Sequence, residues 1–457
     1  MHSDDTIAAI STPPGRGGIG VVRLSGTKSR EIAGAIFHSL SGKTVDEPNR
    51  AQFGRLIDPA TQEPLDEIVV TFFKAPHSYT GEDVVELSCH GSPVILRRVL
   101  DLITARGARI AEPGEFTFRA FFNRRIDLAQ AQAVRDLINA QTEYQARLAT
   151  RQLGGAMAKR LEPVKQTVVD IVVHLESSVE FVEDDISPEA LSALLAKLNR
   201  VIEELSAMAA SFSFGRYVKE GFDLAIIGRP NVGKSSVFNR LIGSDRAIVT
   251  ELPGTTRDAL YESASISGVP VRLIDTAGIR ETSDVVESIG IERSRAAIAD
   301  ADVILLVIDA SLSITEDDLR LLDQISEEQR ILAFNKCDLP LKIDFPSDRI
   351  AQSEAIKISA LSGEGFSYLT EVILKRLSSD VASERDGLMI TDARQEQAIR
   401  RTIELLDEVR SLMLGGELEE IILLRLRGAL SSLGQVTGET LTDDILEQIF
   451  STFCIGK

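Results

Sequence analysis

Residues 228–235, G-R-P-N-V-G-K-S, have the types and spacing of a loop that holds phosphate groups. In the pattern G-x-x-x-x-G-K-S, Gly228 and Gly233 let backbone N–H groups close around phosphate oxygens. Lys234 can neutralise the β- and γ-phosphates, and the Ser235 hydroxyl can bind Mg²⁺. A strand-like run precedes the motif and a helix-forming run follows it, so we expect a nucleoside triphosphate site here.

Two later segments indicate that the base is guanine. In N-K-C-D, residues 335–338, the Asp338 carboxylate can accept hydrogen bonds from guanine N1–H and its 2-amino group. Adenine has neither donor on that edge, and a carboxylate left unpaired is costly, so Asp338 should select GTP over ATP. Ser359 and Ala360 resemble the turn whose backbone N–H meets guanine O6.

Two further motifs lie between the phosphate loop and the base segments. D-T-A-G, residues 275–278, places Asp275 where it can hold Mg²⁺ through water, and Thr256 can bind Mg²⁺ by its hydroxyl and the γ-phosphate by its amide. We predict that GTP contacts Asn231, Val232, Gly233, Lys234, Ser235, Ser236, Thr250, Glu251, Leu252, Pro253, Gly254, Thr255, Thr256, Asp275, Thr276, Ala277, Gly278, Asn335, Lys336, Asp338, Ser359 and Ala360.

The residue after D-T-A-G is unusual for such a site. Ras-like GTPases place a Gln there to orient the attacking water. Here the residue is Ile279, whose side chain can neither donate nor accept a hydrogen bond. Either GTP hydrolysis is impaired in this protein, or another group orients the attacking water in place of the Gln.

Composition restricts the class of protein. The chain has 457 residues, enough for two to four domains, and 44% of them are hydrophobic. It has no apolar run of about 18 residues and no basic start, so we expect neither a membrane span nor a signal peptide. Cys89, Cys337 and Cys454 form no zinc or disulfide pattern, which favours the cytoplasm.

The charge distribution leaves an RNA contact open. The net charge of −19 repels nucleic acid, so such a contact needs a local basic patch. Residues 91–160 contain 12 Lys and Arg against 6 Asp and Glu. This excess fits a tRNA surface, and it fits equally well a set of solvated helix faces that neighbouring acids neutralise.

Hydrophobic patterning predicts four segments that position these residues. Residues 1–120 read as mixed α/β, with a helix over 92–105, and residues 121–216 read as helical. Residues 217–386 alternate strands and helices, which predicts a P-loop α/β domain with a Ras-like parallel sheet. Because residues 387–457 are again helical, we expect this domain to be inserted into a discontinuous all-α domain.

Three segments outside the nucleotide motifs resemble one family. They are D-T-I-A-A-I-S-T-P-P-G-R-G-G-I-G-V-V-R-L-S-G at residues 5–26, E-P-G-E-F-T-F-R-A-F-F-N-R-R-I-D-L-A-Q-A at 112–131, and L-T-D-D-I-L-E-Q-I-F-S-T-F-C-I-G-K at 441–457. Together they resemble the MnmE (TrmE) family of tRNA-modification GTPases over essentially the whole chain.

The resemblance implies an N-terminal folate-binding domain that forms a homodimer, a discontinuous helical domain and an inserted G domain. With a FAD-dependent partner, in a heterotetramer, such a protein modifies C5 of the wobble uridine in certain tRNAs. The product is an aminomethyl or carboxymethylaminomethyl group. Its carbon comes from a tetrahydrofolate derivative, in the 5,10-methylene or 5-formyl form.

By motif match, Arg23, Glu86, Arg125 and Lys457 line the folate site. A carboxylate such as Glu86 can pair with the amino and ring N–H donors of the pterin, and basic side chains suit its acidic tail. Arg125 stands where the family often has Lys, which keeps the charge but changes the geometry. Cys454 could be a nucleophile, although a lone thiol is more often simply packed.

The resemblance also implies an answer for Ile279. Related proteins bind K⁺ where an arginine finger would put its charge, and hard oxygen ligands suit that ion. We expect K⁺ ligands from Asn231, Thr250, the backbone of Leu252 and Thr255.

A second group is needed to orient the water. Glu287, in the segment after D-T-A-G, can act as the catalytic residue that does so, or it can be one of several solvated acids. An internal finger from Arg257 or Arg280 is the alternative to an ion.

Two other functions remain open at the level of sequence. The chain can be a ribosome- or RNA-assembly switch with no role in carbon transfer, or a passive dimerisation scaffold. The folate residues and the F-C-I-G-K end favour the modifying enzyme, because an assembly GTPase has no use for a pterin pocket.

Overall fold

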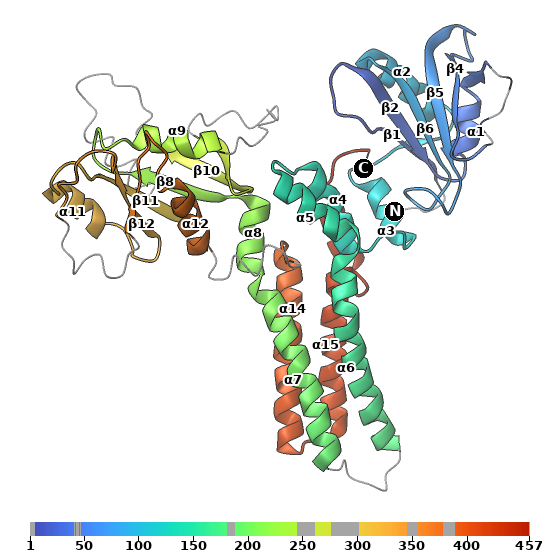
Figure 1. The fold of residues 1–457 in the computed structure, drawn as a ribbon. Helices are drawn as coiled ribbons and strands as arrows, with labels where there is room; N and C mark the ends of the chain where they lie inside the picture. The colour runs from blue at the N-terminus through green and yellow to red at the C-terminus, as the bar shows by residue number, and fades with distance from the viewer. Residues whose placement is uncertain are drawn as a thin grey trace. The chain divides into compact units, whose positions relative to one another are not determined.

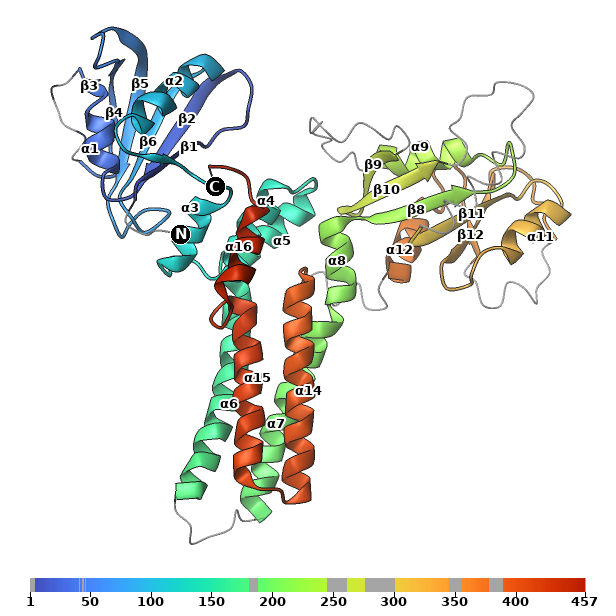
Figure 2. The same ribbon diagram turned by 180° about the vertical axis from the view of Figure 1, so that it is seen from behind.

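The computed structural model describes residues 5–40, 42, 45, 47–180, 188–244, 261–275, 301–344, 355–377 and 389–456 (Figure 1, and from behind in Figure 2). The chain divides into two compact units: Met1–Arg135 with Thr437–Lys457, and Asp136–Val436. No helix among the described residues is long and apolar enough to cross a bilayer.

The first unit is built on a seven-stranded sheet with the order β3-β4-β5-β6-β2-β1-β7. Its strands are β1 (Ile7–Ile10), β2 (Gly17–Ser25), β3 (Phe37–Ser39), β4 (Ala51–Ile57), β5 (Pro64–Phe73), β6 (Val84–Gly91) and β7 (Arg109–Ile110). Neighbours are antiparallel except β1 and β7, which are parallel. The register sets Arg23 on β2 opposite Glu86 on β6.

Helices complete the core of this unit. They are α1 (Ser29–Gly34), α2 (Pro93–Thr104), α3 (Glu115–Phe122), the first part of α4 (Leu128–Ile138) and α16 (Asp443–Ser451). The predicted helix over 92–105 is confirmed, with Ser92 at its N-cap and Pro93 in its first turn. Near the chain end, Phe450 of α16 packs edge-on against Phe118 of α3, with ring centroids 5.3 Å apart.

A bundle of long helices occupies part of the second unit. In both views α6 (Ala156–Glu180), α7 (Pro188–Ala210), α14 (Ala393–Gly415) and α15 (Glu419–Thr437) lie side by side (Figure 1, Figure 2). Arg427 of α15 pairs with Glu176 of α6 at 2.6 Å. Segments from both flanks of the α/β block therefore build one helical domain, which confirms the predicted discontinuity.

The α/β block contains a six-stranded sheet with the order β13-β12-β11-β8-β10-β9, parallel except for β9. Its strands are β8 (Phe222–Ile227), β9 (Tyr261–Ile266), β10 (Val269–Asp275), β11 (Val303–Asp309), β12 (Arg330–Asn335) and β13 (Ala355–Lys357), and its helices are α9 (Lys234–Ser244), α11 (Glu316–Asp323) and α12 (Phe366–Leu377). β11 is buried along its whole length, as a central parallel strand must be.

The two chain segments that connect the α/β block to the helical bundle are held by hydrogen bonds. The chain enters the α/β block through α8 (Phe212–Glu220) and returns just before α14. Ile390 on the return path donates its backbone N–H to Ser211 Oγ at 3.2 Å, just before α8. Gln152 of α5 (Glu143–Leu153) donates from Nε2 to Met389 O at 3.1 Å.

Candidate functional site

The nucleotide motifs gather at one edge of the parallel sheet. G-R-P-N-V-G-K-S follows β8, Asp275 ends β10, and N-K-C-D begins at the last residue of β12. Parallel strands present their carboxyl ends on the same edge, and ligands of open α/β sheets bind there. The topology therefore brings together segments that are up to about a hundred residues apart in sequence.

The phosphate loop packs closely on the base segments. Gly233 has φ +97°, and a Cβ there would lie 2.3 Å from Asn335 Nδ2, so only glycine fits this position. Lys234 Nζ donates to Gly228 O at 2.9 Å and to Arg229 O at 2.8 Å. The ammonium thus lies within the loop that should hold the phosphates. Val232 is buried, whereas Asn231, Ser235 and Ser236 are exposed.

Asn335 joins the two halves of the site. Its side chain is 2% exposed. Nδ2 donates to Val232 O in the phosphate loop at 2.9 Å, and Oδ1 accepts from the Ala360 N–H at 3.0 Å. The amide predicted to meet guanine O6 is therefore bonded to Asn335 in this structure.

Lys336 and Asp338 are held by neighbouring loops. Lys336 Nζ donates to Asn231 O at 2.9 Å and pairs with Asp309 Oδ2 at 2.6 Å. Asp338 is exposed, and one of its oxygens accepts from Ser359 Oγ at 2.6 Å. The other carboxylate oxygen is the one that can receive the guanine N–H groups.

Part of the predicted site lies outside the described residues. This holds for Thr250, Glu251, Leu252, Pro253, Gly254, Thr255, Thr256, Thr276, Ala277, Gly278, Glu287 and Lys457. For Asp275 only the backbone, at the end of β10, is described.

A second group of predicted residues meets on the sheet of the first unit. Arg23 Nε donates to Glu86 Oε1 at 2.9 Å, and Arg23 Nη2 lies 2.8 Å from the same oxygen. The Arg23 guanidinium carbon lies 5.7 Å from the centroid of the Tyr79 ring and 5.8 Å from that of Phe116. A basic group, a carboxylate and two aromatic rings are thus brought together on β2, β6 and their neighbours.

Arg125 and the chain end approach the same strands. The Arg125 side chain lies against the backbone at Gly81, two residues beyond Tyr79. Gly456 O accepts from Ser11 Oγ at 3.1 Å, directly after β1, whose residue Ala9 pairs with Arg23. Gly456 therefore lies close to β1, the strand that pairs with the one carrying Arg23.

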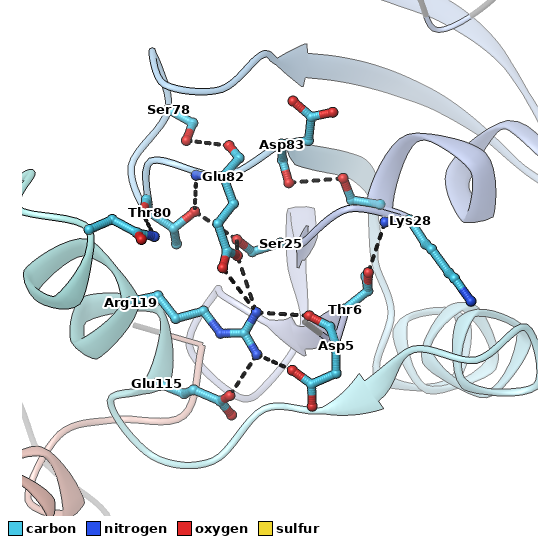
Figure 3. Close-up of polar contacts among 12 residues, drawn as sticks. Asp5, Thr6, Ser25, Lys28, Ser78, Thr80, Glu82, Asp83, Glu115 and Arg119 are labelled. Atoms are coloured by element: carbon cyan, nitrogen blue, oxygen red, sulfur yellow. Dashed lines mark hydrogen bonds and ion pairs between the residues drawn. The ribbon is translucent and has the colours of Figure 1, made fainter. Parts of the chain in front are cut away.

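An ionic network centred on the buried Arg119 and Glu115 fixes the loop that carries Tyr79 (Figure 3). Arg119, 5% exposed, pairs with Glu115 at 3.0 Å, with Glu82 at 3.1 Å and with Asp5 at 2.5 Å. Arg109 adds a 2.7 Å pair with Glu115. Burial raises the pKa of the Glu115 carboxyl, but hydrogen bonds from Arg109, the Glu112 N–H and Arg119 outweigh it and leave the pKa below its usual value.

Further hydrogen bonds complete this support. Glu82 also accepts from Ser25 Oγ at 2.7 Å, and Ser78 Oγ donates to Glu82 O (Figure 3). In addition, Asn123 Nδ2 donates to Thr80 O at 2.8 Å. Residues 78–83 are thereby fixed from several sides.

Sequence reasoning missed the two aromatic rings beside Arg23 and this ionic network. Glu115 and Arg119 stand four residues apart on a helix, a spacing that could have indicated an ion pair. Nothing local indicates that Asp5 and Glu82 join them, because that depends on the tertiary fold. The Cys89 thiol is buried, which raises its pKa to about 12, so it is no nucleophile at neutral pH.

Acidic neighbours neutralise part of the basic stretch 91–160. Arg98 pairs with Asp58, Arg109 and Arg119 belong to the network above, and Arg160 pairs with Glu204 at 3.5 Å. The excess of basic residues in the sequence therefore overstates the charge available to RNA.

Comparison with known proteins identifies the family. The model for the N-terminus of the GTP-binding protein TrmE matches residues 6–125, and the model for the MnmE helical domain matches residues 128–454. The tRNA modification GTPase MnmE of Koribacter versatilis is 49% identical, with 100% of both chains covered. Those of Aquifex aeolicus and Alkaliphilus metalliredigens are 44% and 41% identical, with at least 99% of this chain and 100% of each relative covered. The chain therefore belongs to the MnmE (TrmE) family of tRNA modification GTPases.

Proposed function

We propose that this GTPase acts as a K⁺-dependent homodimer in the cytoplasm. Together with a FAD-dependent partner, in a heterotetramer, it forms the aminomethyl or carboxymethylaminomethyl group at C5 of the wobble uridine of certain tRNAs. The carbon donor is a methylene-tetrahydrofolate. In this proposal residues 1–120 form the folate-binding domain, 217–386 the G domain, and 121–216 with 387–457 the helical domain.

The observation that carries the folate part is the Arg23–Glu86 pair, with the Arg23 guanidinium beside the partly exposed Tyr79 ring. Glu86 Oε1 is engaged by Arg23, which leaves Oε2 for the amino and ring N–H donors of a pterin. The Tyr79 ring, which is partly exposed, can contact one of its flat faces, whereas Phe116 is buried and supports Arg23 from below the surface. The folate, when bound, supplies the one-carbon unit, while Arg125 and Lys457 are proposed to bind its acidic tail.

Equilibrium binding of 5-formyl-tetrahydrofolate tests this site. We expect Glu86→Ala to weaken binding at least about tenfold, since one hydrogen-bonded carboxylate is lost. Glu67→Ala is the matched control, because Glu67 is an exposed carboxylate, 54% accessible, that pairs with Arg55. Equal affinity of the wild type, Glu86→Ala and Glu67→Ala for the folate would contradict a pterin site on β2 and β6.

The nucleotide part rests on the linked phosphate loop and base segments. Ser235 at the start of α9 is exposed and can bind Mg²⁺ together with Thr256 and Asp275. Mg²⁺, when bound, stabilises the charge that develops on the phosphates.

For K⁺ we propose Asn231, Thr250, Leu252 and Thr255 as ligands. Asn231 is exposed, and its backbone, at φ +64°, is held by the Lys336 bond. Replacing K⁺ by Na⁺ should abolish most of the turnover of the wild type, and Asn231→Ala should remove the difference between the two salts. Unchanged turnover in Na⁺ contradicts this part.

Glu287 is proposed to orient the attacking water in place of the Gln that Ile279 replaces. Glu287→Ala should lower kcat for GTP hydrolysis by about a hundredfold or more with little change in GDP affinity. A variant with wild-type turnover rules Glu287 out.

The alternative is an assembly switch that hydrolyses GTP without carbon transfer. Reconstitution with the flavoprotein partner and tRNA separates the two functions. We expect wobble-uridine modification that needs GTP, K⁺ and the folate together, whereas an assembly switch would form no modified uridine under any of these conditions.

A further inference from the structure

Arg240 on α9 contacts three consecutive backbone carbonyls of the loop after β13. Its Nη1 donates to Ala360 O at 3.4 Å and Leu361 O at 3.1 Å, and its Nη2 donates to Ser362 O at 3.0 Å. The guanidinium carbon lies 5.9 Å from the centroid of the Phe366 ring. The helix that begins at the phosphate-binding Lys234 is thereby tied to the turn next to Asp338.

These contacts determine where the amides of the turn point. Within a peptide unit the C=O of one residue and the N–H of the next point in opposite directions. Because the carbonyls of 360, 361 and 362 face Arg240, the N–H groups of Leu361, Ser362 and Gly363 face away from it. Ser362 donates to Ser359 Oγ at 3.1 Å and Gly363 to Ser359 O at 2.8 Å.

Leu361 remains as the donor for a ligand. Within the described part of the chain its N–H donates no hydrogen bond, and the Ala360 N–H is already bonded to Asn335 Oδ1. The same turn holds Asp338 through Ser359 Oγ. A donor from Leu361 beside the acceptor Asp338 matches one edge of guanine: O6 next to N1–H.

We propose that Arg240 is a positioning residue for base recognition: it holds residues 359–363 so that the Leu361 N–H meets guanine O6. This inference rests on the proposed guanine site at Asp338. Arg240 itself touches no nucleotide and acts through the turn.

The test measures dissociation constants of three diphosphates for the wild type and for Arg240→Ala. GDP and IDP both carry O6, and IDP lacks only the 2-amino group. 2-Aminopurine riboside diphosphate has hydrogen in place of O6 and therefore no hydrogen on N1, so it lacks both groups of the edge that Leu361 and Asp338 are proposed to meet. We expect Arg240→Ala to weaken GDP and IDP by the same factor, about tenfold, and the O6-less nucleotide by less than about twofold.

Two further variants complete the test. In Arg240→Lys the ammonium can donate to one carbonyl but cannot make the two-pronged contact of a guanidinium. The loss of GDP affinity should therefore lie between zero and the loss in Arg240→Ala. Arg320→Ala removes an arginine of α11 that is 70% exposed, and it should change no affinity.

The outcomes separate the inference from the function on which it rests. Equal losses for all three nucleotides, or no loss for GDP, overturn the role of Arg240. A wild type that binds ADP as tightly as GDP instead overturns the guanine site itself. If Arg240→Ala does not fold, the comparison is made with Arg240→Lys, for which the loss must again require the edge formed by O6 and N1–H.

Discussion

Lys336 shows how single residues organise the nucleotide site. Its ammonium is fixed by Asn231 O on one side and by Asp309 Oδ2 on the other. Asp309 is 4% exposed; burial raises the pKa of its carboxyl, but hydrogen bonds from Lys336 and Ser311 outweigh this, so the pKa stays below its usual value. The carboxylate is therefore charged at neutral pH and holds Lys336 against the phosphate loop.

We predict that Asp309→Asn weakens GDP binding about tenfold, because Lys336 loses its anionic partner and Asn231 loses a fixed donor. kcat at saturating GTP should change much less. Binding titrations and steady-state kinetics measure the two quantities. Asp317→Asn, an exposed carboxylate in the same domain, is the control, and an equal loss in both variants contradicts the prediction.

The stability of the first unit should depend on pH through the carboxylate of Glu115. The Glu115 carboxyl is 1% exposed and its pKa lies below the ordinary value of 4.5. A lowered folded-state pKa contributes stability that is present above pH 4.5 and is lost as the pH falls through the folded-state value. Glu115→Gln should therefore destabilise the first unit by about 3 kcal/mol at pH 7 and by progressively less as the pH falls below 4.5.

Hydrogen exchange of β1 and α3 at several pH values checks this expectation. Glu47→Gln, on an exposed carboxylate of the same unit, should leave the pH profile unchanged. A Glu115→Gln variant whose destabilisation is constant from pH 7 to pH 3 would show that the lost contribution is packing and not charge.

At the scale of elements, the β9–β10 hairpin links the G domain to α5. Thr142, the N-cap of α5, donates from Oγ1 to Gly268 O at 2.7 Å, and Gln145 Nε2 donates to Val218 O at 2.9 Å. Both residues also form the capping box of the helix. Because β10 ends at Asp275, this contact fixes the strand that leads into D-T-A-G.

Within this contact, Gly268 occupies a position that a larger residue cannot easily fill. Its φ is +86°, and a Cβ there would lie 2.8 Å from Tyr144 Cβ. We predict that Gly268→Ala costs about 1–3 kcal/mol locally and speeds hydrogen exchange in residues 261–275. Gly243→Ala, at a helical glycine with open space around it, should not do so. Unchanged exchange in Gly268→Ala would show that the hairpin adapts to the side chain.

The elements also show what sequence patterning can reach. Eight strands, namely β1, β2, β5, β6, β8, β10, β11 and β12, coincide with apolar runs of the sequence, and such runs indicate strands because a sheet buries them. β9, Y-E-S-A-S-I, is an edge strand with polar residues, and β13 has three residues, so neither carries a local signal. Motifs located the phosphate loop, but the links of Asn335 and Arg240 depend on tertiary contacts that no motif contains.

At the scale of the molecule, the two candidate sites belong to different compact units. Arg23 and Glu86 lie in Met1–Arg135, and the phosphate loop lies in Asp136–Val436. Each unit has its own buried apolar core. A ligand that binds only the folded form stabilises the unit that contains its site.

We therefore predict that the two ligands protect different parts of the chain. At about a hundred times its dissociation constant, GDP should stabilise the α/β block by about 2.7 kcal/mol, and 5-formyl-tetrahydrofolate should give the first unit a similar gain. Hydrogen exchange resolves the two, with slower exchange in β8, β11 and β12 for GDP and in β2 and β6 for the folate. Glu86→Ala should lose only the folate effect, and Asp309→Asn should reduce only that of GDP. If either ligand alone protects both sheets equally, the units are thermodynamically coupled and the sites communicate even without the partner protein or tRNA.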